Sequence, residues 1–468
     1  MQIIKHVFVL ACCIQLIACS VQKPIAKIAE STILSDSLLA TAHVGICVYD
    51  ATDNKYLYNY QGNKYFIPAS NTKIATCYAA MKYLGDSLVG LRYQRMMNNG
   101  LRIIPTGDPS FLHPDFRTNP ALDFLKKENG HINLSLGNWQ ESPLGEGWSW
   151  DDYNDDYMVE RSAMPIYGNV VNFHLSIVLG ENGGIETIPH YNFQSMPSFF
   201  QQKTFLSPKD DSSRIFIVGD TVGYFYPRNI KIKRRWNNND FLIMPSQKPF
   251  KDVTIPFSTD EEGLVATLLV DTLHKKISVV EPSIYSALVP INSIHTIHSQ
   301  PTDSLLKIMM HRSDNFYAEQ SLLMVANEHI GIMNDAKIID TLLKTDYAAM
   351  PQRPQWVDGS GLSRYNLFTP QDFVFILNKM RNEFSWERIT TIFSTGDDGT
   401  LGSYYKGLKG KIFAKTGSLS NNIALSGYLI TQKNKTLIFS VLVNNHTVSS
   451  TSVRKAVERF LTAVQLDN

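Results

Sequence analysis

Three short motifs, found in one order, constrain this chain more than any other feature. They are Ser70-Asn71-Thr72-Lys73, Ser313-Asp314-Asn315 and Lys415-Thr416-Gly417. Taken singly, the first two are weak, because Ser-x-x-Lys begins at five different serines and Ser-x-Asn recurs at Ser420. Lys-Thr-Gly occurs once. The signal therefore comes from the order of the motifs and from the local structure predicted around each.

Ser70 is expected to lie at the N-terminus of a helix. Apolar side chains follow it at helical spacing until Gly85 stops the run: Ile74, Cys77, Tyr78, Met81 and Leu84. A helix N-terminus favours developing negative charge. Residues three apart share a helix face, so Lys73 would lie one turn from Ser70. Alone, this pattern more readily indicates a serine cap followed by a solvated lysine.

The other two motifs also have ordinary interpretations. Ser313-Asp314-Asn315 falls between helical stretches at 302–311 and 316–328, where a capping turn is common. Lys415 ends an apolar strand, with strand-like runs following at 424–430 and 436–443, and a lysine on an edge strand often prevents aggregation. Gly417 lacks a Cβ and would let a ligand backbone lie close to the strand. Together and in this order, we expect the motifs to form one site.

The motif set resembles that of the penicillin-recognising serine acyl-transferases. The interval of 243 residues between Ser70 and Ser313 is similar to that of class C low-molecular-mass penicillin-binding proteins, the D-alanyl-D-alanine carboxypeptidase/endopeptidase family, which carries extra domains there. Class A β-lactamases have a much shorter interval. Further segments resemble family motifs: Thr106-Gly107-Asp108-Pro109, 147–152, 358–364 and 398–401. Thr106 replaces the family's first glycine in its motif, and Ser418 a frequent threonine.

The resemblance implies an α/β (α+β) penicillin-binding-protein/β-lactamase-like transpeptidase fold with a strand-rich inserted region. A discontinuous acyl-serine catalytic domain would comprise 41–89 and 291–468, and one or two inserted domains would occupy 90–290. The sequence predicts a hairpin over 42–60 and a last helix with one apolar face. Strand-like runs within the insertion are 214–218, 240–244 and 276–280.

The implied function is a serine-type D-Ala-D-Ala carboxypeptidase, DD-endopeptidase or both, acting on peptidoglycan stem peptides without a cofactor and inhibited by β-lactams. Ser70 would form the acyl-enzyme and Lys73 would be its base. Ser313 would relay a proton and Asn315 would bind the substrate's side amide. Lys73 must be neutral to act as a base, and burial beside Lys415 would lower its pKa. A drop of about three units from about 10.4 corresponds to roughly 4 kcal/mol.

The resemblance also implies substrate-binding residues. Lys415 and Thr416 would hold the substrate's terminal carboxylate beside Gly417, and the backbone N–H groups of Ser70 and Ser418 would form the oxyanion hole. A side pocket would read the free end of the stem peptide's diamino acid, with Asp152 pairing an ammonium and Arg364 a carboxylate. Tyr157 completes that pocket. Asp152 has three acidic neighbours that could match the same family position instead: Asp151, Asp155 and Asp156.

The N-terminus predicts export. Lys5 precedes an apolar run over 7–18 that is too short to span a bilayer. The run ends Leu16-Ile17-Ala18-Cys19, which resembles a bacterial lipobox. We expect 1–19 to be a lipoprotein-type signal, Cys19 to be acylated and 20–40 to be a tether. The protein would then face the periplasm, held to the membrane only by this lipid, and a plain secretory signal is the alternative.

Composition excludes some functions. A net charge of +1 gives no bulk field for nucleic acid. The basic run over 231–235 (Lys231, Lys233, Arg234 and Arg235) is interpreted as a solvated strand face. Cys47 and Cys77 lie in apolar periodic stretches and are expected to be buried free thiols. The histidines form no metal constellation, so no metal is predicted.

Alternatives remain open on the same motifs. They are a β-lactamase or esterase on this fold, and a non-catalytic wall-binding or β-lactam-sensing lipoprotein. The sequence does not separate carboxypeptidase from endopeptidase activity, and it does not identify the diamino acid.

Overall fold

The computed structural model describes residues 22–96, 100–178, 190–206, 230–248, 250–261, 263–280 and 294–467. These residues form two compact units. The first contains the described residues up to Tyr83, Thr302–Ala318 and the described residues from Asp335 onward. The second contains Leu84–Pro301 and Glu319–Asn334. The domain boundaries expected from the sequence stay a prediction.

An antiparallel sheet forms the centre of the first unit. Its order is β14-β15-β16-β17-β1-β2. The strands are β1 (His43–Asp50), β2 (Lys55–Tyr60), β14 (Ser394–Thr395), β15 (Ile412–Leu419), β16 (Asn422–Ile430) and β17 (Thr436–Asn444). β1 pairs with β17 along its whole length, from His43 opposite Asn444 to Asp50 opposite Leu437. The predicted N-terminal hairpin is thereby joined to the predicted C-terminal strands in one sheet.

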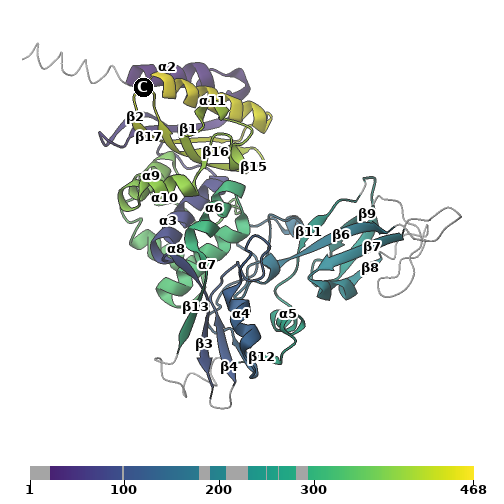
Figure 1. Cartoon of the computed structure of the whole chain (residues 1–468). Helices are drawn as coiled ribbons and strands as arrows, with labels where there is room; N and C mark the ends of the chain where they lie inside the picture. The colour runs from purple at the N-terminus through teal and green to yellow at the C-terminus, as the bar shows by residue number, and fades with distance from the viewer. Residues whose placement is uncertain are drawn as a thin grey trace, which may run out of the picture. The chain divides into compact units, whose positions relative to one another are not determined.

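Helices cover both faces of this sheet (Figure 1). α2 (Gln22–Ala29) and α11 (Ser450–Asp467) lie on one face, and α9 (Pro370–Glu383) packs on the other, against β1 and β17. The predicted apolar face of α11 is buried: Val453, Val457, Phe460, Leu461 and Val464. This face packs against alternate side chains of the sheet to form one hydrophobic core, as expected for an amphipathic helix on a sheet.

The expectation of a tether over 20–40 is wrong for its described part. Residues 22–39 form α2, a π-helical turn (Glu30–Leu34) and a 3₁₀ turn (Ser37–Leu39). Ile25, Ala29 and Ile33 are completely buried in the core shared with α11. These side chains lie four apart and so share one helix face, and the partner that buries it stands at the other end of the sequence.

The central helix of the first unit is α3 (Lys73–Tyr83). The predicted helix is confirmed, but its expected amphipathic character is not, because every residue from Lys73 to Met81 is buried. A helix enclosed on all sides can hold a lysine away from water, which a surface helix cannot. The remaining helices of this unit are α6 (Thr302–Arg312), the start of α7 (Asn315–Ile330), α8 (Asp335–Lys344) and α10 (Trp386–Ile392).

The second unit is rich in strands, as predicted. A mixed sheet has the order β12-β5-β4-β3-β13, and smaller sheets have the orders β11-β6-β7 and β8-β10-β9. The strands are β3 (Ser87–Arg95), β4 (Leu101–Pro105), β5 (Ile132–Ser135), β6 (Val170–Val178), β7 (His190–Met196), β8 (Thr204–Leu206), β9 (Ile230–Arg234), β10 (Phe241–Pro245), β11 (Val253–Pro256), β12 (Ile277–Val280) and β13 (His295–Pro301). Helices α4 (Pro120–Lys127) and α5 (Leu264–Leu273) share its core.

Most local predictions in this region are confirmed. The runs at 240–244 and 276–280 correspond to β10 and β12, and the run at 214–218 lies outside the described residues. In the first unit, Cys47 and Cys77 are buried free thiols, as expected. The predicted solvated basic face is confirmed for three of its four residues. Lys231, Lys233 and Arg235 are exposed, whereas Arg234 is 2% exposed.

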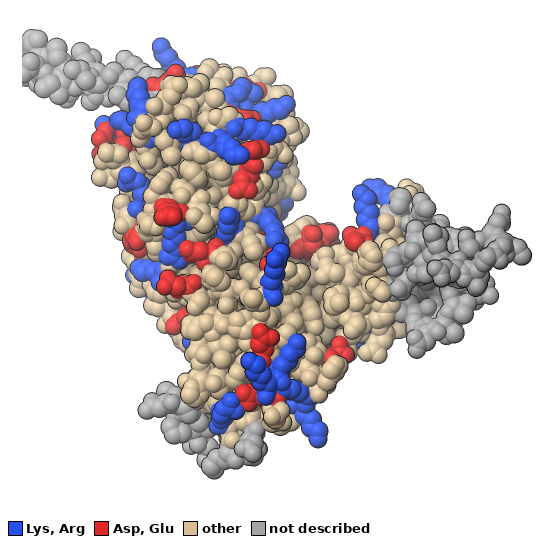
Figure 2. All heavy atoms as spheres, viewed as in Figure 1, with Lys and Arg blue, Asp and Glu red and all other residues tan. Residues whose placement is uncertain are grey.

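Lys and Arg are interspersed with Asp and Glu on the face of the first unit that Figure 2 shows. This mixture agrees with the net charge of +1. Within the described ranges, no helix has the length and apolar character that crossing a membrane requires.

Candidate active site

Ser70 lies on a short 3₁₀ turn that leads into α3. The turn spans Ala69–Thr72, and Lys73 is the first residue of the α-helix. Ala69 has a φ of +49°, a left-handed conformation that is uncommon for a residue with a Cβ. Such strain occurs often at functional sites, where the surroundings hold it in place. Ser70 itself is half-buried, so its hydroxyl remains within reach of a ligand.

Lys73 is completely buried, which contradicts the interpretation of a solvated lysine. Its Nζ lies 3.0 Å from Ser70 Oγ, 2.6 Å from Asn315 Oδ1 and 2.7 Å from the carbonyl oxygen of Ser360. The last two atoms can only accept hydrogen bonds, so they take two N–H groups of the amine. The remaining tetrahedral position faces Ser70. In a neutral lysine this position carries the lone pair that can take the Ser70 proton.

The loop that supplies the Ser360 carbonyl is held by the buried carboxylate of Asp358. Its oxygens accept hydrogen bonds from the backbone N–H of Gly361 (2.8 Å) and Ser363 (2.6 Å) and from the Asn366 amide (2.8 Å). Thr76 of α3 donates to the Gly359 carbonyl at 2.6 Å. Backbone donors satisfy a buried carboxylate and fix the loop around it.

Gly361 permits the close approach of this loop to the Ser70 turn. Its φ is +82°, and a Cβ at this position would lie 1.9 Å from the carbonyl oxygen of Ala69. Both the conformation and the space therefore require glycine. The loop over 358–364 was matched to a family motif, but its contribution of a backbone acceptor to Lys73 was not predicted. A main-chain carbonyl leaves no residue-type signature in a sequence.

Ser313 lies in the turn between α6 and α7. It has a φ of +61°, and its Oγ accepts a hydrogen bond from Lys415 Nζ at 2.8 Å. Asp314 accepts from the backbone N–H of Tyr317 at 2.9 Å and so caps α7, as the capping-turn interpretation expected. Asn315, the first residue of α7, places its amide oxygen on Lys73. One turn thus provides both a structural cap and two side chains of the site.

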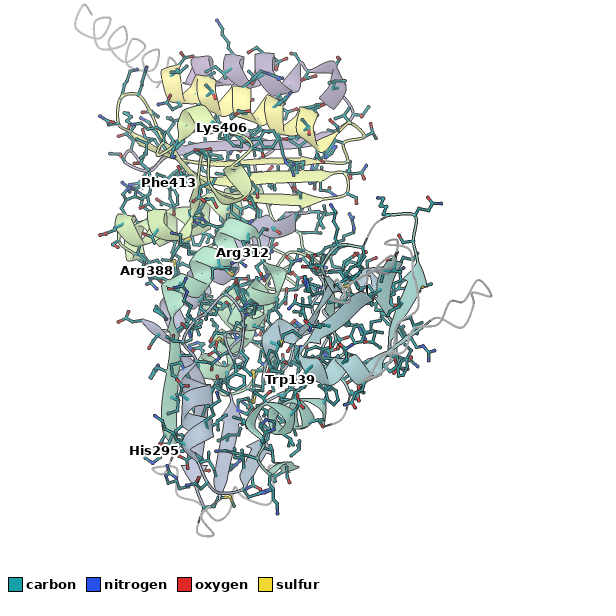
Figure 3. All side chains as sticks on the ribbon, turned by 45° about the vertical axis from the view of Figure 1, so that its right-hand side comes forward. Trp139, His295, Arg312, Arg388, Lys406 and Phe413 are labelled. Atoms are coloured by element: carbon teal, nitrogen blue, oxygen red, sulfur yellow. The ribbon has the colours of Figure 1, made fainter. Side chains whose placement is uncertain are left out.

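α6, which leads to this turn, is anchored to α10 by an ion pair. Arg388, labelled in Figure 3, donates to Asp303 from two nitrogens: Nε lies 3.0 Å from each carboxylate oxygen, and Nη2 lies 2.8 Å from Oδ1. A bidentate arginine–carboxylate pair fixes orientation as well as distance.

Lys415 is completely buried in the middle of β15 and is not an exposed edge lysine. Its Nζ donates to Ser313 Oγ and, at 2.8 Å, to the carbonyl oxygen of Thr416. Burial lowers the pKa of Lys415 well below its usual value, and the positive charge of Lys73 lowers it further. The site therefore holds two amines that disfavour each other's protonation.

Gly417 brings β15 against the Ser70 turn. A Cβ on Gly417 would lie 2.6 Å from the carbonyl oxygen of Pro68 and 3.1 Å from the backbone nitrogen of Asn71. The buried side chain of Asn71 completes the contact. With its amide turned to suit its neighbours, its nitrogen donates to the Lys415 carbonyl and its oxygen accepts from the Ser426 hydroxyl, both at 2.7 Å. Asn71 thus joins the first and third motifs, a role that sequence reasoning missed.

Two further contacts support the outer part of β15. Thr416 Oγ1 lies 2.8 Å from the hydroxyl of Thr400, a residue of the segment over 398–401. The exposed hydroxyl of Ser418 accepts a hydrogen bond from Arg454 Nη2 of α11 at 2.7 Å. Neither Thr400 nor Arg454 was singled out as a side chain of the site, although Thr400 lies in a segment that matched a family motif.

The three residues expected in a side pocket divide between the two units. Arg364 is exposed in the first unit, where its Nη1 donates to the Ser420 carbonyl at 3.4 Å. Asp152 and Tyr157 belong to the second unit, and the Tyr157 hydroxyl donates to Asp155 Oδ2 at 3.1 Å. Burial, and then hydrogen bonding to Asp152, raises the pKa of Tyr157. Whether Arg364 meets the other two stays a prediction.

Ser70, Lys73, Ser313, Asn315 and Lys415 all lie in the first unit. Hydrogen bonds of 2.6–3.0 Å join Lys73 to Ser70 and Asn315, and one of 2.8 Å joins Lys415 to Ser313. Thr416, Gly417 and Ser418 continue along β15 beside them. Cys19 lies outside the described residues. Within the described part of the chain, His, Cys, Asp and Glu form no group of three or more that could hold a metal ion.

Comparison with known proteins identifies the family. The family model for the D-Ala-D-Ala carboxypeptidase 3 (S13) family matches residues 26–215 and 231–464, and the chain belongs to this family. D-alanyl-D-alanine carboxypeptidase DacB of Haemophilus influenzae is 22% identical over 438 residues, covering 88% of each chain. D-alanyl-D-alanine carboxypeptidase of Actinomadura sp. (strain R39) is 24% identical over 451 residues, covering 88% of this chain and 80% of that one.

Solved structures support the fold. The crystal structure of penicillin binding protein 4 (dacB) from Haemophilus influenzae superposes with a TM-score of 0.64 at 19% identity, covering 94% of this chain and 98% of that chain. The same protein complexed with a novel β-lactam also gives a TM-score of 0.64, at 17% identity. The expected penicillin-binding-protein fold and the expected class are confirmed. The protein is a class C low-molecular-mass penicillin-binding protein, a serine peptidase of the D-Ala-D-Ala carboxypeptidase family that works in the bacterial cell envelope.

Proposed function

We propose that the enzyme hydrolyses peptidoglycan stem peptides through an acyl-enzyme on Ser70, with Lys73 as the base. The observation that supports this most directly is the arrangement around Lys73 Nζ. Asn315 Oδ1 and the Ser360 carbonyl occupy two positions of the amine, and the third faces Ser70 Oγ at 3.0 Å. A general base needs to lie within hydrogen-bond distance of the atom whose proton it removes, and 3.0 Å between Nζ and Oγ meets that requirement.

In the first step, Ser70 Oγ attacks the carbonyl carbon of the penultimate D-Ala while its proton moves to Lys73. The C–N bond to the terminal residue then breaks, and the leaving amine takes a proton. Ser313 can deliver that proton, because its hydroxyl lies 2.8 Å from Lys415 Nζ, from which it can be replenished. In the second step, water attacks the ester on Ser70 and releases the shortened peptide.

The carboxylate of the substrate's terminal residue would bind at β15. Lys415 supplies a positive charge when protonated, and the Thr416 hydroxyl supplies a hydrogen bond. The backbone N–H groups of Ser70 and Ser418 would stabilise the oxyanion, and removing one such donor typically costs 10²–10³ in kcat. Asp152, Tyr157 and Arg364 remain the proposed readers of the diamino acid.

The burial of both lysines argues against a non-catalytic wall-binding protein. Placing an amine in an apolar interior is costly unless its hydrogen bonds are satisfied, and a pure binding site has no need of two such groups in contact with serines. A β-lactamase on this fold would differ in how fast water attacks the acyl-enzyme. The family match favours the peptidase.

We further propose that the protein is a lipoprotein, anchored through Cys19. The sequence Leu16-Ile17-Ala18-Cys19 supports this assignment. Metabolic labelling with a fatty-acid analogue tests this assignment. The wild-type protein should incorporate the label, and Cys19→Ala should not.

Digestion of purified muropeptides tests the reaction itself. The wild-type protein should release D-Ala from a monomeric pentapeptide, cleave cross-linked dimers, or do both, and Ser70→Ala should do neither. The ratio of the two products decides between carboxypeptidase and endopeptidase activity. A folded wild-type protein that cleaves neither substrate would contradict the proposal.

A further inference from the structure

The second unit contains a polar cleft of about 610 Å³ that the reaction at Ser70 does not use. Its walls come from residues 142–144, from the turn between β9 and β10, and from residues 160, 203, 258, 260 and 261. Asp152 and Tyr157, the residues of the second unit proposed to read the diamino acid, do not line it. We call it the Trp236 cleft, after the aromatic residue in its wall.

Trp236 presents its ring to solvent at this cleft. Its side chain is 47% exposed, and the neighbouring Trp150 is 70% exposed. The two rings lie 6.2 Å apart, edge to face, and Tyr153 packs on Trp236 at 4.9 Å. Of the described tryptophans with large exposure, Trp386 stands elsewhere, in the first unit. An exposed indole in the wall of a cleft, with a second exposed indole beside it, indicates a binding surface, because a large amphipathic ring is otherwise buried more completely.

Trp236 is held rigidly by its surroundings. Arg234, the buried member of the basic run, pairs with the buried Glu160 at 3.1 Å and lies 5.3 Å from the centre of the Tyr153 ring. Asn154 accepts from the backbone N–H of Arg234 at 2.7 Å. The turn that carries Trp236 is thus fixed to the segment over 150–154, so the aromatic surface is formed before a ligand arrives.

Three of the four carboxylates that line the cleft are paired with a cation, and the fourth, Asp260, is exposed. Glu160 pairs with Arg234 and also accepts from the backbone N–H of Thr259 at 2.6 Å. Glu261 pairs with Lys203 at 2.6 Å. Asp240, at the far end of the turn, pairs with Arg235 at 3.4 Å. A charged ligand would gain little where each of these carboxylates has a cation beside it. The exposed Asn237 and Asp260 offer hydrogen bonds to neutral hydroxyl and amide groups.

We propose that the Trp236 cleft binds a neutral pyranose oligosaccharide. The apolar face of a sugar ring would stack on Trp236, and its hydroxyl and N-acetyl groups would hydrogen-bond to the side chains of Asn237 and Asp260. A flat aromatic ring beside side-chain amides and carboxylates suits this ligand better than it suits a peptide backbone. Because this inference rests on the proposed action on peptidoglycan, the glycan strand of peptidoglycan is the expected source of the ligand.

Binding of chitotetraose, a neutral β-1,4-linked N-acetylglucosamine tetramer without peptide, tests the proposal. Titration of the full chain, followed by tryptophan fluorescence and calorimetry, should show saturable binding. Trp236→Ala should weaken it by at least about tenfold, whereas Trp236→Phe, which keeps a ring, should weaken it less. Trp386→Phe, at an exposed tryptophan of the first unit, should leave the affinity unchanged.

Two parallel measurements separate this inference from the proposed function. If the wild-type enzyme releases D-Ala from a sugar-free pentapeptide but does not bind chitotetraose, the carbohydrate site is overturned and the peptidase stands. If chitotetraose binds and Ser70 is inert toward peptide, the site stands and the proposed reaction fails. If the pentapeptide, rather than the sugar, changes the fluorescence of Ser70→Ala in a manner that depends on Trp236, the cleft is a peptide site and the proposal is wrong.

Discussion

The Ser360 carbonyl oxygen accepts a hydrogen bond from Lys73 Nζ at 2.7 Å, joining two residues that are 287 positions apart in the sequence. This contact helps to fix the direction of the amine, because it takes one N–H group while Asn315 takes another. The reactive position of Lys73 is therefore set by a backbone loop and not by the helix alone.

Gly361→Ala should damage the site through this loop. The added Cβ would meet the Ala69 carbonyl at 1.9 Å, so either the loop or the Ser70 turn must move. A shift of about 1 Å at reacting groups can cost about 10²-fold in rate, and we expect acylation by benzylpenicillin to slow by that order.

Gly410→Ala is the matched control. Gly410 also has a positive φ, +69°, but nothing lies within 4 Å of its Cβ position. Both changes carry the left-handed conformational cost of about 1 kcal/mol. Equal acylation rates in the two variants would show that the loop contact does not position Lys73.

Arg454→Ala should lower activity through Ser418. Arg454 Nη2 donates to the Ser418 hydroxyl at 2.7 Å, at the residue whose N–H is proposed for the oxyanion hole. We expect kcat/KM for stem peptide to fall about tenfold, as for loss of a hydrogen bond to a charged group. Arg459→Ala, on the same helix and paired with Asp36, should have little effect.

A double-mutant cycle decides whether Arg454 acts through Ser418. In a Ser418→Ala background, Arg454→Ala should cause no further loss. A loss of the same size in both backgrounds would mean that Arg454 acts independently of Ser418.

Asp152→Ala should raise KM for stem peptide and spare acylation by a simple β-lactam, because only the peptide carries the diamino acid. Because one ion pair to the substrate is lost, we expect KM for stem peptide to increase about tenfold. Asp151→Ala is the matched control for the choice among neighbouring acids. Unchanged peptide kinetics in Asp152→Ala, or the effect appearing in Asp151→Ala, would remove Asp152 from the pocket.

Asp372 should make stability depend on pH. Burial raises the pKa of this carboxyl from 3.8 to about 6, although it caps α9 by accepting from the backbone N–H of Thr369 at 2.8 Å. The folded state therefore holds this proton more tightly, and its stabilising contribution is present below pH 3.8 and lost as the pH rises through about 6.

The pH dependence can be measured by difference. The free energy of unfolding of the wild type relative to Asp372→Asn should fall by about 2 kcal/mol between pH 4 and pH 7. Asp340→Asn, at an exposed ion pair, is the control. A difference between the wild type and Asp372→Asn that stays constant with pH would contradict the assignment.

Residue types and periodicity predicted the elements that carry the site. The helix after Ser70, the helices on either side of Ser313 and the strand of Lys415 are all present. What periodicity could not predict was the burial of Lys73 and Lys415, because a lysine in a helix or strand is normally solvated. Only the three motifs taken together indicated otherwise.

The missed contacts share a physical cause. Asn71 bonds to Lys415 and Ser426, and Arg454 to Ser418, across long separations in the chain, so no local pattern marks them. Arg234 looked like one more residue of a basic run, and its burial depends on Glu160, which is 74 positions away. Ile25, Ile28 and Ala29 fit one face of the helix at 22–29, but the core that buries this face is shared with α11, which lies at the other end of the sequence.

Mass spectrometry of the intact mature protein after incubation with benzylpenicillin tests the central claim most directly. The account predicts one covalent adduct, located on Ser70 by peptide mapping, absent in Ser70→Ala and formed at least about 10²-fold more slowly in Lys73→Met. A folded wild-type protein that stays unmodified, or an adduct that persists in Ser70→Ala, would contradict it.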